Sequence, residues 1–549
     1  MTLFAIVLCG VLHLHLVFVR QVNWDEFYFL SRIQEHGRGT LATAVQTMHV
    51  HFFGWLAQVP GHEIDQIVAA RLVMLLLLFG TATLIYRVST RFFSQDAALL
   101  AVLSYLSCGY VLSHGASFRF DPISTFLLML ALALLLTPNL RSAHTVLAGL
   151  SIALAGLVTI KSVFYLPTIV AVSMWRLCEA TDRGGTLSRL SLGAAATTAG
   201  FIVLYFVHSG SLAGAGFSAS QAVIAQSYQK TIDFGAIFPS WRYFAETVRQ
   251  SPATWILIAA GLVAAIRAAI HAKGAARRRW LVILAFAVPL TTLAFYRNGF
   301  PYFYGFFLAP VAILAGVALD ELNWPRAPWA WVATFMCATA GMSYWVGLPP
   351  GQTDQRATVR AVHAIFPEPV NYIDRCSMIG SFPKLGFFMS SWGIEVYRAA
   401  RRPIFREILL DRAPAFVLAN GPALESALTQ RPSEVAESHL LFPEDAEVLR
   451  ANFVWHWGPI WVAGKAFELA QGTGSSRFEV LIESRYTVEA ESGVLIDHAA
   501  YRPGDVVILS QGWHSIRTAE RDQTVILRWG AHLHRPPHAA PDGPIFRGF

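Results

Sequence analysis

Repeated apolar runs of bilayer length constrain this chain more than any other feature. An α-helix needs about 17–25 mainly apolar residues to cross the hydrocarbon core of a membrane. Eleven runs of about this length occur before residue 348, near 2–19, 66–86, 97–113, 122–136, 145–160, 162–176, 190–208, 252–269, 280–296, 303–319 and 328–347. The sequence therefore predicts an α-helical, polytopic membrane domain with about eleven spans.

The amino-acid composition agrees with a membrane protein. Apolar residues make up 54% of the 549 residues and charged residues only 14%, whereas soluble domains usually carry about 25% charged residues. The net charge of +7 does not indicate nucleic-acid binding, because membrane proteins concentrate Lys and Arg in cytoplasmic loops. We expect membrane lipid, and no nucleic acid, among the partners.

The distribution of Lys and Arg predicts the side that each loop faces. With a cytoplasmic N-terminus, the inside loops hold 12 Lys or Arg in 53 residues, and the outside loops hold 8 in 103. This bias follows the positive-inside rule only if 145–176 forms two short spans, because a single span would place Arg277, Arg278 and Arg279 outside. We therefore expect a multi-pass protein of the inner membrane whose C-terminal region is periplasmic.

The composition becomes polar near residue 350. Residues 349–472 mix helical and strand patterns, and Arg502-Pro503-Gly504-Asp505 supplies a turn between short strands. The strand patterns are Phe478/Val480/Ile482, Tyr486/Val488, Val494/Ile496, Val506/Ile508 and Val525/Leu527/Trp529. We predict a membrane domain over 1–348, an α/β region over 349–472 and a small β-sandwich over 473–549.

Two carboxylates, Asp25 and Glu26, follow the first apolar run directly and are flanked by Trp24 and Phe27. A carboxylate held in a poorly hydrated cleft can act as a general base. Acids in surface loops are more commonly just solvated. A pair of solvated loop acids is therefore the alternative interpretation.

Further charged groups occur at the predicted outer ends of the spans. Arg119 and Asp121 share a short loop before the fourth run, where a simple ion pair is the alternative, since such pairs are common and weak. Lys161, Lys230 and Arg297 lie at other outer boundaries. Long basic side chains at span ends also extend to the headgroup level for purely structural reasons.

Aromatic and histidine residues accompany these charges. Tyr302 and Tyr304 follow Arg297, and His49 and His51 lie in the first predicted outer loop. The two histidines could ligate a metal ion together with Asp25, although this spacing alone is a weak signal.

The order of these groups resembles the C-type glycosyltransferase fold, in the branch of the protein O-mannosyltransferases and the lipid A aminoarabinose transferase (glycosyltransferase family 39). An Asp-Glu pair follows the first span, Arg119-Phe120-Asp121 opens the fourth, and Thr159-Ile160-Lys161 ends the fifth. Arg297 and Pro301-Tyr302-Phe303-Tyr304 precede a late span that contains Ala309-Pro310. The resemblance covers about residues 1–347.

The resemblance implies transfer of a sugar from a polyprenyl-phosphate donor to a hydroxyl acceptor on the outer face of the membrane, with inversion. Asp25 is then the base, and Glu26 and Asp121 are further catalytic acids. The implied substrate-binding residues are Arg119, Lys161, Arg297, Tyr302, Tyr304, His49 and His51. The chemistry needs no cofactor, although a divalent metal ion could replace some of the arginines.

Two departures from the family leave the acceptor open among lipid, glycan and protein. The lumenal insertion of the eukaryotic O-mannosyltransferases is missing, and the C-terminal region has no counterpart that maps onto the aminoarabinose transferase. The alternative functions are a glycan ligase that uses a diphosphate-linked donor and a transporter or flippase. A transporter would place its charges at the bilayer midplane, often in repeated halves, whereas the acids here lie near the outer boundary.

Overall fold

The computed structural model describes residues 1–212, 237–322, 326–346, 351–429, 435–470, 475–518, 522–541 and 543–546. Lys230, most of the predicted second outer loop and the predicted boundary at 472/473 lie outside these residues. The chain forms two compact units. Unit 1 comprises Met1–Arg20, Arg32–Val59 and Ile67–Pro349, and unit 2 comprises Gln21–Ser31, Pro60–Gln66 and Pro350–Phe549.

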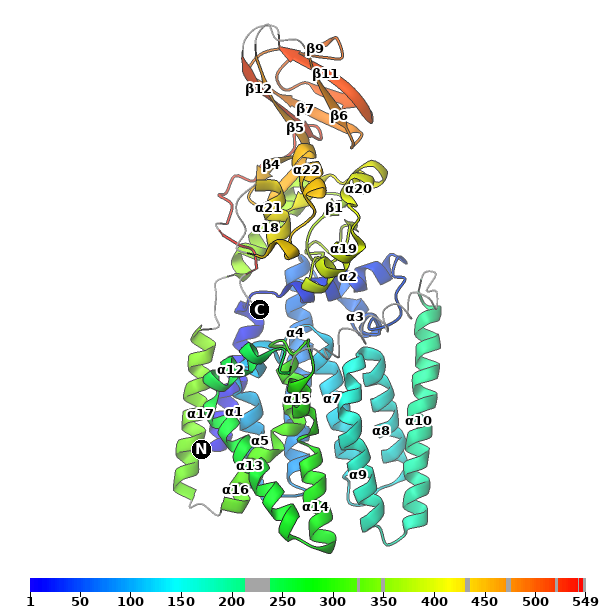
Figure 1. Ribbon diagram of the computed structural model, residues 1–549, viewed down its shortest axis with the longest axis vertical. Coiled ribbons are helices and arrows are strands. Elements are labelled where there is room, and N and C mark those ends of the chain that lie inside the picture. The colour runs from blue at the N-terminus through cyan, green and yellow to red at the C-terminus, as the bar shows by residue number, and fades with distance from the viewer. Residues whose placement is uncertain are drawn as a thin grey trace. The chain divides into compact units, whose positions relative to one another are not determined.

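Unit 1 is helical, and its long helices run side by side (Figure 1). Two further helices, α2 (Trp24–Gly37) and α4 (Glu63–Ser89), have residues in both units. The elements of unit 1 are α1 (Thr2–Val19), α3 (His49–Phe53), η1 (Gly54–Gln58), α5 (Gln95–Leu106), α6 (Gly109–His114), α7 (Phe120–Leu135), α8 (Ser142–Val158), η2 (Ile160–Tyr165), α9 (Leu166–Glu179), α10 (Arg183–Gly210), α12 (Trp241–Gln250), α13 (Pro252–His271), α14 (Gly274–Ala285), η3 (Val288–Ala294), α15 (Phe303–Val311), α16 (Ile313–Leu322) and α17 (Arg326–Val346).

Each predicted span coincides with one helix or with a broken pair of helical segments. The run 145–176 forms α8 and α9, which are separated by the 3₁₀ helix η2, so the expected interruption of this run is present. Five helical stretches in the described part of the chain are long and apolar enough to cross a membrane. Because α5, α7 and α8 are shorter than this criterion, the number of eleven crossings stays a prediction.

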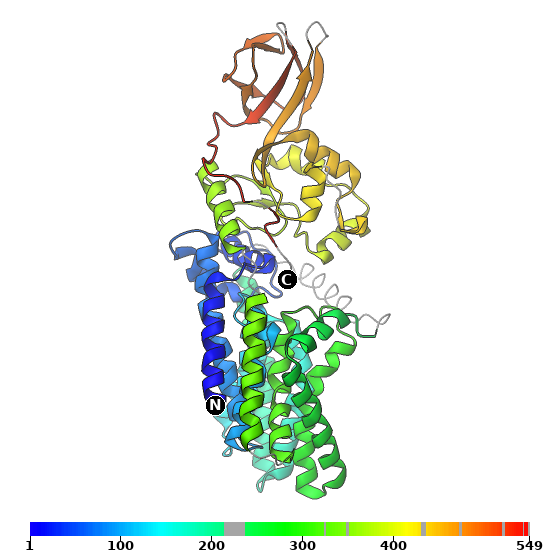
Figure 2. The same ribbon diagram turned by 90° about the vertical axis from the view of Figure 1, so that its left-hand side faces the viewer.

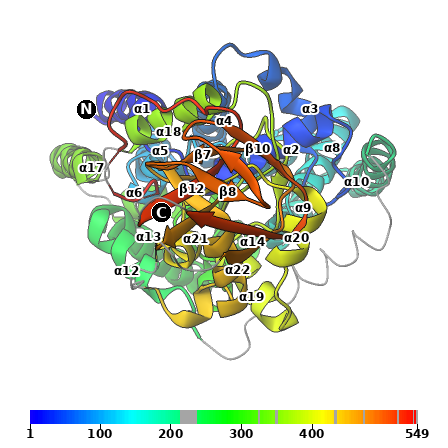
Figure 3. The ribbon, with the colours of Figure 1, turned by 90° about the horizontal axis from the view of Figure 1, so that it is seen from above.

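Helix α8 packs against α7 on one side and α10 on the other (Figure 1), and α8 and α10 also lie side by side when seen from above (Figure 3). Small residues allow α8 and α10 to approach closely, because a Cβ atom at Gly193 would lie 2.9 Å from the carbonyl oxygen of Thr145. Membrane helices commonly associate through small residues of this kind. This packing places the end of α8 beside the start of α7, where the charged residues of the site lie.

Unit 2 combines helices with two sheets (Figure 2). Its elements are α18 (Gln352–Ile365), β1 (Tyr372–Ile373), β2 (Lys384–Leu385), α19 (Ser391–Ala400), α20 (Phe405–Arg412), β3 (Phe416–Leu418), α21 (Pro422–Thr429), η4 (Glu437–His439), α22 (Pro443–Asn452), β4 (Phe453–Trp457), β5 (Ile460–Leu469), β6 (Ser476–Val480), β7 (Ser484–Glu489), β8 (Val494–Ile496), β9 (Ala499–Tyr501), β10 (Val506–Leu509), β11 (Gly512–Thr518) and β12 (Gln523–Trp529).

The larger sheet has eight strands, in the order β10-β7-β12-β5-β3-β1-β2, with β4 also paired to β5. The smaller sheet has the order β6-β11-β8-β9. The long strand β5 pairs with β3 and β4 at one end and with β12 at the other, so one sheet runs through both the α/β part and the sandwich. Two separate apolar cores, one around Phe405, Leu424 and Phe453 and one around Val488 and Ile516, fill these two parts.

Strand β10 differs from the predicted pattern. Its buried side chains are Val507 and Leu509, whereas Ile508 is 72% exposed. All four residues of the strand are apolar, so alternation could not identify the inward face, and a shift of one residue exchanges the two faces. The predicted turn at 502–505 is present, with Asp505 Oδ2 accepting the Arg502 N–H at 2.7 Å.

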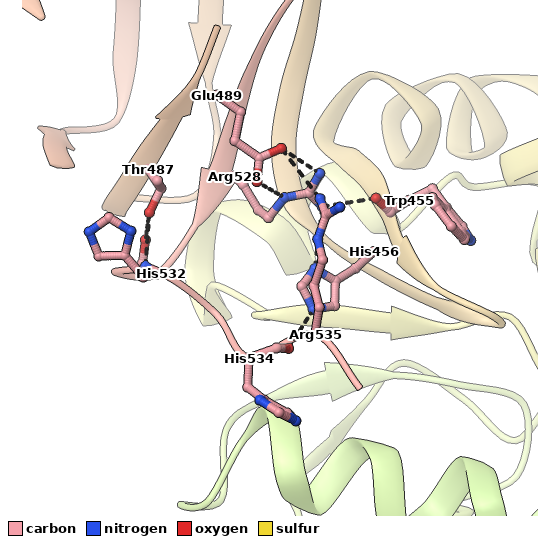
Figure 4. Close-up of polar contacts among 9 residues, drawn as sticks. Trp455, His456, Thr487, Glu489, Arg528, His532, His534 and Arg535 are labelled. Carbon is pink, nitrogen blue, oxygen red and sulfur yellow. Dashed lines mark hydrogen bonds and ion pairs between the residues drawn. The ribbon is translucent and has the colours of Figure 1, made fainter. Parts of the chain in front are cut away.

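An ion pair between the buried Arg528 and the partly exposed Glu489 joins strands β12 and β7 in unit 2 (Figure 4). Arg528 donates from Nε and Nη2 to the two carboxylate oxygens of Glu489 at 2.6 and 2.9 Å. Arg528 Nη1 donates to the carbonyl oxygen of Trp455 at 2.8 Å, and His456 Nε2 donates to the carbonyl oxygen of His534. The network therefore ties β4, β7, β12 and the segment after β12 together.

Candidate functional site

Asp121 lies at the centre of a buried group of charges in unit 1. It occupies the first turn of α7, where the helix dipole favours a carboxylate. Lys161 Nζ lies 2.6 Å from Asp121 Oδ1, and Arg119 Nε lies 3.5 Å from Asp121 Oδ2. Only 6% of the Arg119 side chain and 13% of the Lys161 side chain are exposed. We call these three residues the Asp121 cluster.

Local structure explains why the three side chains converge. Arg119 is the extended residue that immediately precedes α7. Thr159 follows α8 and caps the start of η2. Its hydroxyl accepts the backbone N–H of Lys161 at 3.5 Å. The packing of α7 against α8 then brings Lys161 to Asp121. The cluster therefore joins two cations to one carboxylate.

Tyr302 forms the aromatic side of the cluster. The guanidinium carbon of Arg119 lies 3.5 Å from the centroid of the Tyr302 ring, and Lys161 Nζ lies 5.0 Å from it. Both distances are within the range of attractive cation–π contacts. A narrow cavity at this position is lined in part by His114, Arg119, Asp121, Thr125, Tyr302 and Gly305. Arg20 Nη2 lies 3.2 Å from the Nε2 atom of His114.

Two other predicted binding residues of unit 1 have different surroundings. Arg297 is exposed in the turn between η3 and α15, and its carbonyl oxygen accepts the Ser240 hydroxyl at 3.2 Å. Tyr304 is fully buried, and its ring packs 5.0 Å from that of Tyr110. Within the described residues, the Tyr304 hydroxyl has no hydrogen-bond partner. Of the predicted tyrosines, Tyr302 is the one that contacts the cations.

The two predicted histidines have different neighbours. The ring of His49 lies 5.2 Å from that of Phe120, next to the start of α7. His51 Nε2 lies 2.8 Å from His208 Nδ1 on α10. Neither histidine belongs to a group of three potential metal ligands within the described chain.

Asp25 and Glu26 belong to unit 2 and have distinct local roles. The Glu26 carboxylate accepts the Asn23 N–H at 2.9 Å, and the Asn23 side-chain oxygen accepts the Asp25 N–H at 3.0 Å. This reciprocal arrangement is a capping box that closes the start of α2. Glu26 is completely buried, and Asp25 is partly exposed. The fold thus uses the Glu26 carboxylate, and not that of Asp25, as the cap.

Arg375 is a candidate site residue that the sequence did not reveal. Its guanidinium carbon lies 4.1 Å from the centroid of the Trp24 ring, beside Asp25 in the sequence. Burial lowers the pKa of Arg375, while the charges of Asp25 and Glu425 act in the opposite direction. No local pattern marks Arg375, because its partners lie far away in the sequence. The sequence likewise did not reveal that His62, Glu63 and His363 lie close together.

These features define a polytopic helical fold with buried charges at helix ends, attached to a unit of mixed helices and strands. This is the fold of the C-type membrane glycosyltransferases, as the sequence predicted. The apo oligosaccharyltransferase of Archaeoglobus fulgidus matches with a TM-score of 0.58 and 10% identity over 98% of each chain. Apo ArnT from Cupriavidus metallidurans matches with a TM-score of 0.54 and 14% identity, over 76% of this chain and 92% of that one.

A second ArnT structure from the same organism, bound to undecaprenyl phosphate, matches with a TM-score of 0.50 and 15% identity over 75% of this chain and 91% of that one. No family model and no curated protein matches the sequence. At these identities the likeness shows a shared fold.

Proposed function

We propose that this protein is a membrane glycosyltransferase that moves a sugar from a polyprenyl-phosphate donor to a hydroxyl acceptor, with inversion. The observation that carries the proposal is the Asp121 cluster, in which buried Arg119 and Lys161 share one carboxylate beside Tyr302. Two buried cations side by side suit a phosphate group, because charge-assisted hydrogen bonds to phosphate oxygens are strong. The ArnT structure with undecaprenyl phosphate supports a donor of this kind.

The proposed reaction is a single displacement. The acceptor oxygen forms a bond to the anomeric carbon as the bond from that carbon to the phosphate oxygen breaks. The electron pair of the broken bond leaves with the polyprenyl phosphate, which gains negative charge. Lys161 and Arg119 stabilise that developing charge, and Asp121 holds the two cations in position.

The acceptor hydroxyl must lose its proton during attack, because its pKa is high. We assign Asp25 as the general base that takes this proton, and Glu26 as the residue that fixes the start of α2 around it. Arg375, which stacks on Trp24, is assigned as a positioning residue for Asp25. Arg297 is the further proposed phosphate ligand, because an exposed arginine can bind two phosphate oxygens.

Binding of undecaprenyl phosphate to the purified full chain tests the donor assignment. Lys161→Ala and Arg119→Ala should each weaken binding about 10–100-fold, since a hydrogen bond to a charged group contributes roughly 1.5–3 kcal/mol. Arg249→Ala, which breaks the exposed pair with Glu246 in unit 1, is the matched control and should bind normally. Equal affinity in all four proteins would overturn the assignment.

Mass spectrometry of envelope glycans and lipids, from cells with and without the gene, tests the transfer itself. We expect one sugar modification to disappear without the gene and to return with the wild-type gene but not with Asp121→Asn. Donor binding without any change in glycans would favour a transporter or flippase instead.

A further inference from the structure

Two histidines and a buried glutamate converge in unit 2, apart from the residues assigned to transfer. His62 directly precedes α4, Glu63 is its first residue, and His363 lies in the last turn of α18. Their potential ligand atoms lie within 4.8 Å of one another. Among the described residues, no other group of three His, Cys, Asp or Glu ligands is this compact.

The two oxygens of Glu63 have different surroundings. Oε1 accepts the hydroxyl of Ser381 at 2.6 Å and its backbone N–H at 3.2 Å. Oε2 lies 3.0 Å from His363 Nε2, and the side chain of Glu63 is only 3% exposed. The rings of His62 and His363 stack with their centroids 4.4 Å apart and an angle of 13° between planes. Ser381 therefore orients the Glu63 carboxylate, and Glu63 Oε2 lies beside the imidazole of His363.

We propose that His62, Glu63 and His363 bind a divalent transition-metal ion of the Zn²⁺ type. Two imidazole nitrogens and one carboxylate oxygen are the donor set of three-ligand zinc sites, which leave a fourth position for water. His363 is 22% exposed, and His62 is partly exposed, so water can reach that position. Mg²⁺ and Ca²⁺ do not fit, because these hard cations prefer sites made of oxygen.

The required adjustment is small. Ligand atoms around a tetrahedral Zn²⁺ lie roughly 3.3–3.5 Å apart, given bond lengths of about 2.0–2.2 Å. The pair Glu63–His363 is already at 3.0 Å. His62 lies in a loop rather than inside a helix, so rotation of its ring brings the third ligand inward. Ser381 is the outer partner that orients a ligating carboxylate, as in many metal sites.

A bound ion would join two parts of unit 2 that are far apart in sequence, the segment 60–66 and helix α18. An ion that binds only the folded state stabilises that state, and the rise in unfolding temperature grows with the logarithm of the ion concentration relative to its Kd. This role is independent of sugar transfer. Its failure would leave the proposed glycosyltransferase activity untouched.

The test uses the metal-free full chain, purified with a tag that contains no histidine and titrated with Zn²⁺ by calorimetry. We expect one high-affinity Zn²⁺ ion per chain and a rise in unfolding temperature. His62→Ala, Glu63→Gln and His363→Ala should each weaken binding more than the roughly 10–100-fold that outer-sphere partners contribute. Mg²⁺ should give neither heat nor a temperature shift.

Two control variants distinguish this site from other histidines. His439→Ala removes a histidine of unit 2 outside the cluster, and His51→Ala removes the one that contacts His208 in unit 1. Both should bind Zn²⁺ like the wild type. His62 is the variant position least coupled to folding, because it is partly exposed and outside the helix. Absence of Zn²⁺ binding by the wild type, or unchanged affinity in folded His62→Ala, would overturn the proposal.

Discussion

Each unit of this protein buries an arginine beside a carboxylate, but the geometry of the contact differs between the two groups. In unit 2, all three nitrogens of Arg528 have partners, two on Glu489 and one on a backbone carbonyl (Figure 4). In unit 1, Arg119 Nε lies 3.5 Å from Asp121 Oδ2, and the guanidinium carbon of Arg119 lies 3.5 Å from the centroid of the Tyr302 ring.

The charge balance of the two groups differs as well. The second cation on Glu489 is Arg535, which is 54% exposed, so its charge is largely screened by water. The second cation on Asp121 is Lys161, which is 13% exposed. The second cation is therefore largely solvated in unit 2 and mostly buried in unit 1. We infer that the first arrangement stabilises the fold and that the second suits an anionic ligand.

The largest effect that would test the division between fold-stabilising and functional charges is expected at two adjacent carboxylates, Asp25 and Glu26. Asp25→Asn should lower turnover by about 10²–10⁴, the usual contribution of a general base, and leave the unfolding temperature unchanged. Glu26→Ala removes the side chain that accepts the Asn23 N–H and should mainly lower stability, by about 0.5–2 kcal/mol, the usual cost of losing a helix cap. Steady-state kinetics and thermal unfolding of both variants measure these effects. Normal turnover in Asp25→Asn would remove it as the base.

The next largest effect is expected in the Asp121 cluster. Lys161→Ala should reduce turnover by about 10²–10³, the range for loss of one group that stabilises transition-state charge. Folding should change little, because Arg119 remains beside Asp121. Kinetics at saturating donor separate the loss of catalysis from the loss of binding. If Lys161→Ala unfolds readily but has normal turnover, the Asp121 cluster has a structural role, like the group around Arg528.

The converse is expected for Arg528→Met. Removal of this arginine should cost about 3 kcal/mol, the lower end of the range for breaking a buried pair, because Glu489 is 34% exposed. Hydrogen exchange in the full chain should show faster exchange in β7 and β12. Affinity for undecaprenyl phosphate should be unchanged. A loss of affinity would contradict the division of roles between the two groups.

The helical framework could be predicted from sequence because bilayer-length apolar runs are local signals. The pairing of Asp121 with Lys161 was not visible in spacing, and only the resemblance placed both in one site. Strand β11 was missed, since Gly512-Trp513-His514 lacks the alternation of its neighbours. Arg375 and the cluster of His62, Glu63 and His363 depend on contacts between distant segments, which no local pattern encodes.

The smallest predicted effect concerns an ion pair at the surface of the sandwich, His514 with Asp497, whose closest atoms are 2.5 Å apart. Burial lowers the pKa of His514, but the hydrogen bonds to Asp497 and to the Ser510 carbonyl outweigh it, so the net pKa is raised above 6.5. Burial raises the pKa of Asp497, but the contacts with His514 and Ser515 leave it below 3.8.

Because the pKa of His514 is raised in the folded state, protonated His514 stabilises the fold fully below pH 6.5. This stabilisation is lost as the pH rises through the pKa of the folded state. Because the pKa of Asp497 is lowered in the folded state, ionised Asp497 stabilises the fold above pH 3.8. This stabilisation is lost as the pH falls through the pKa of the folded state. Asp497→Asn should therefore lower the unfolding temperature more at about pH 5 than at about pH 9. Because 46% of Asp497 is exposed, the difference should stay below about 1 kcal/mol. Thermal unfolding of both proteins across this range measures it, and an equal loss at both pH values would mean that only the pH-independent hydrogen bonds from Ser515 matter.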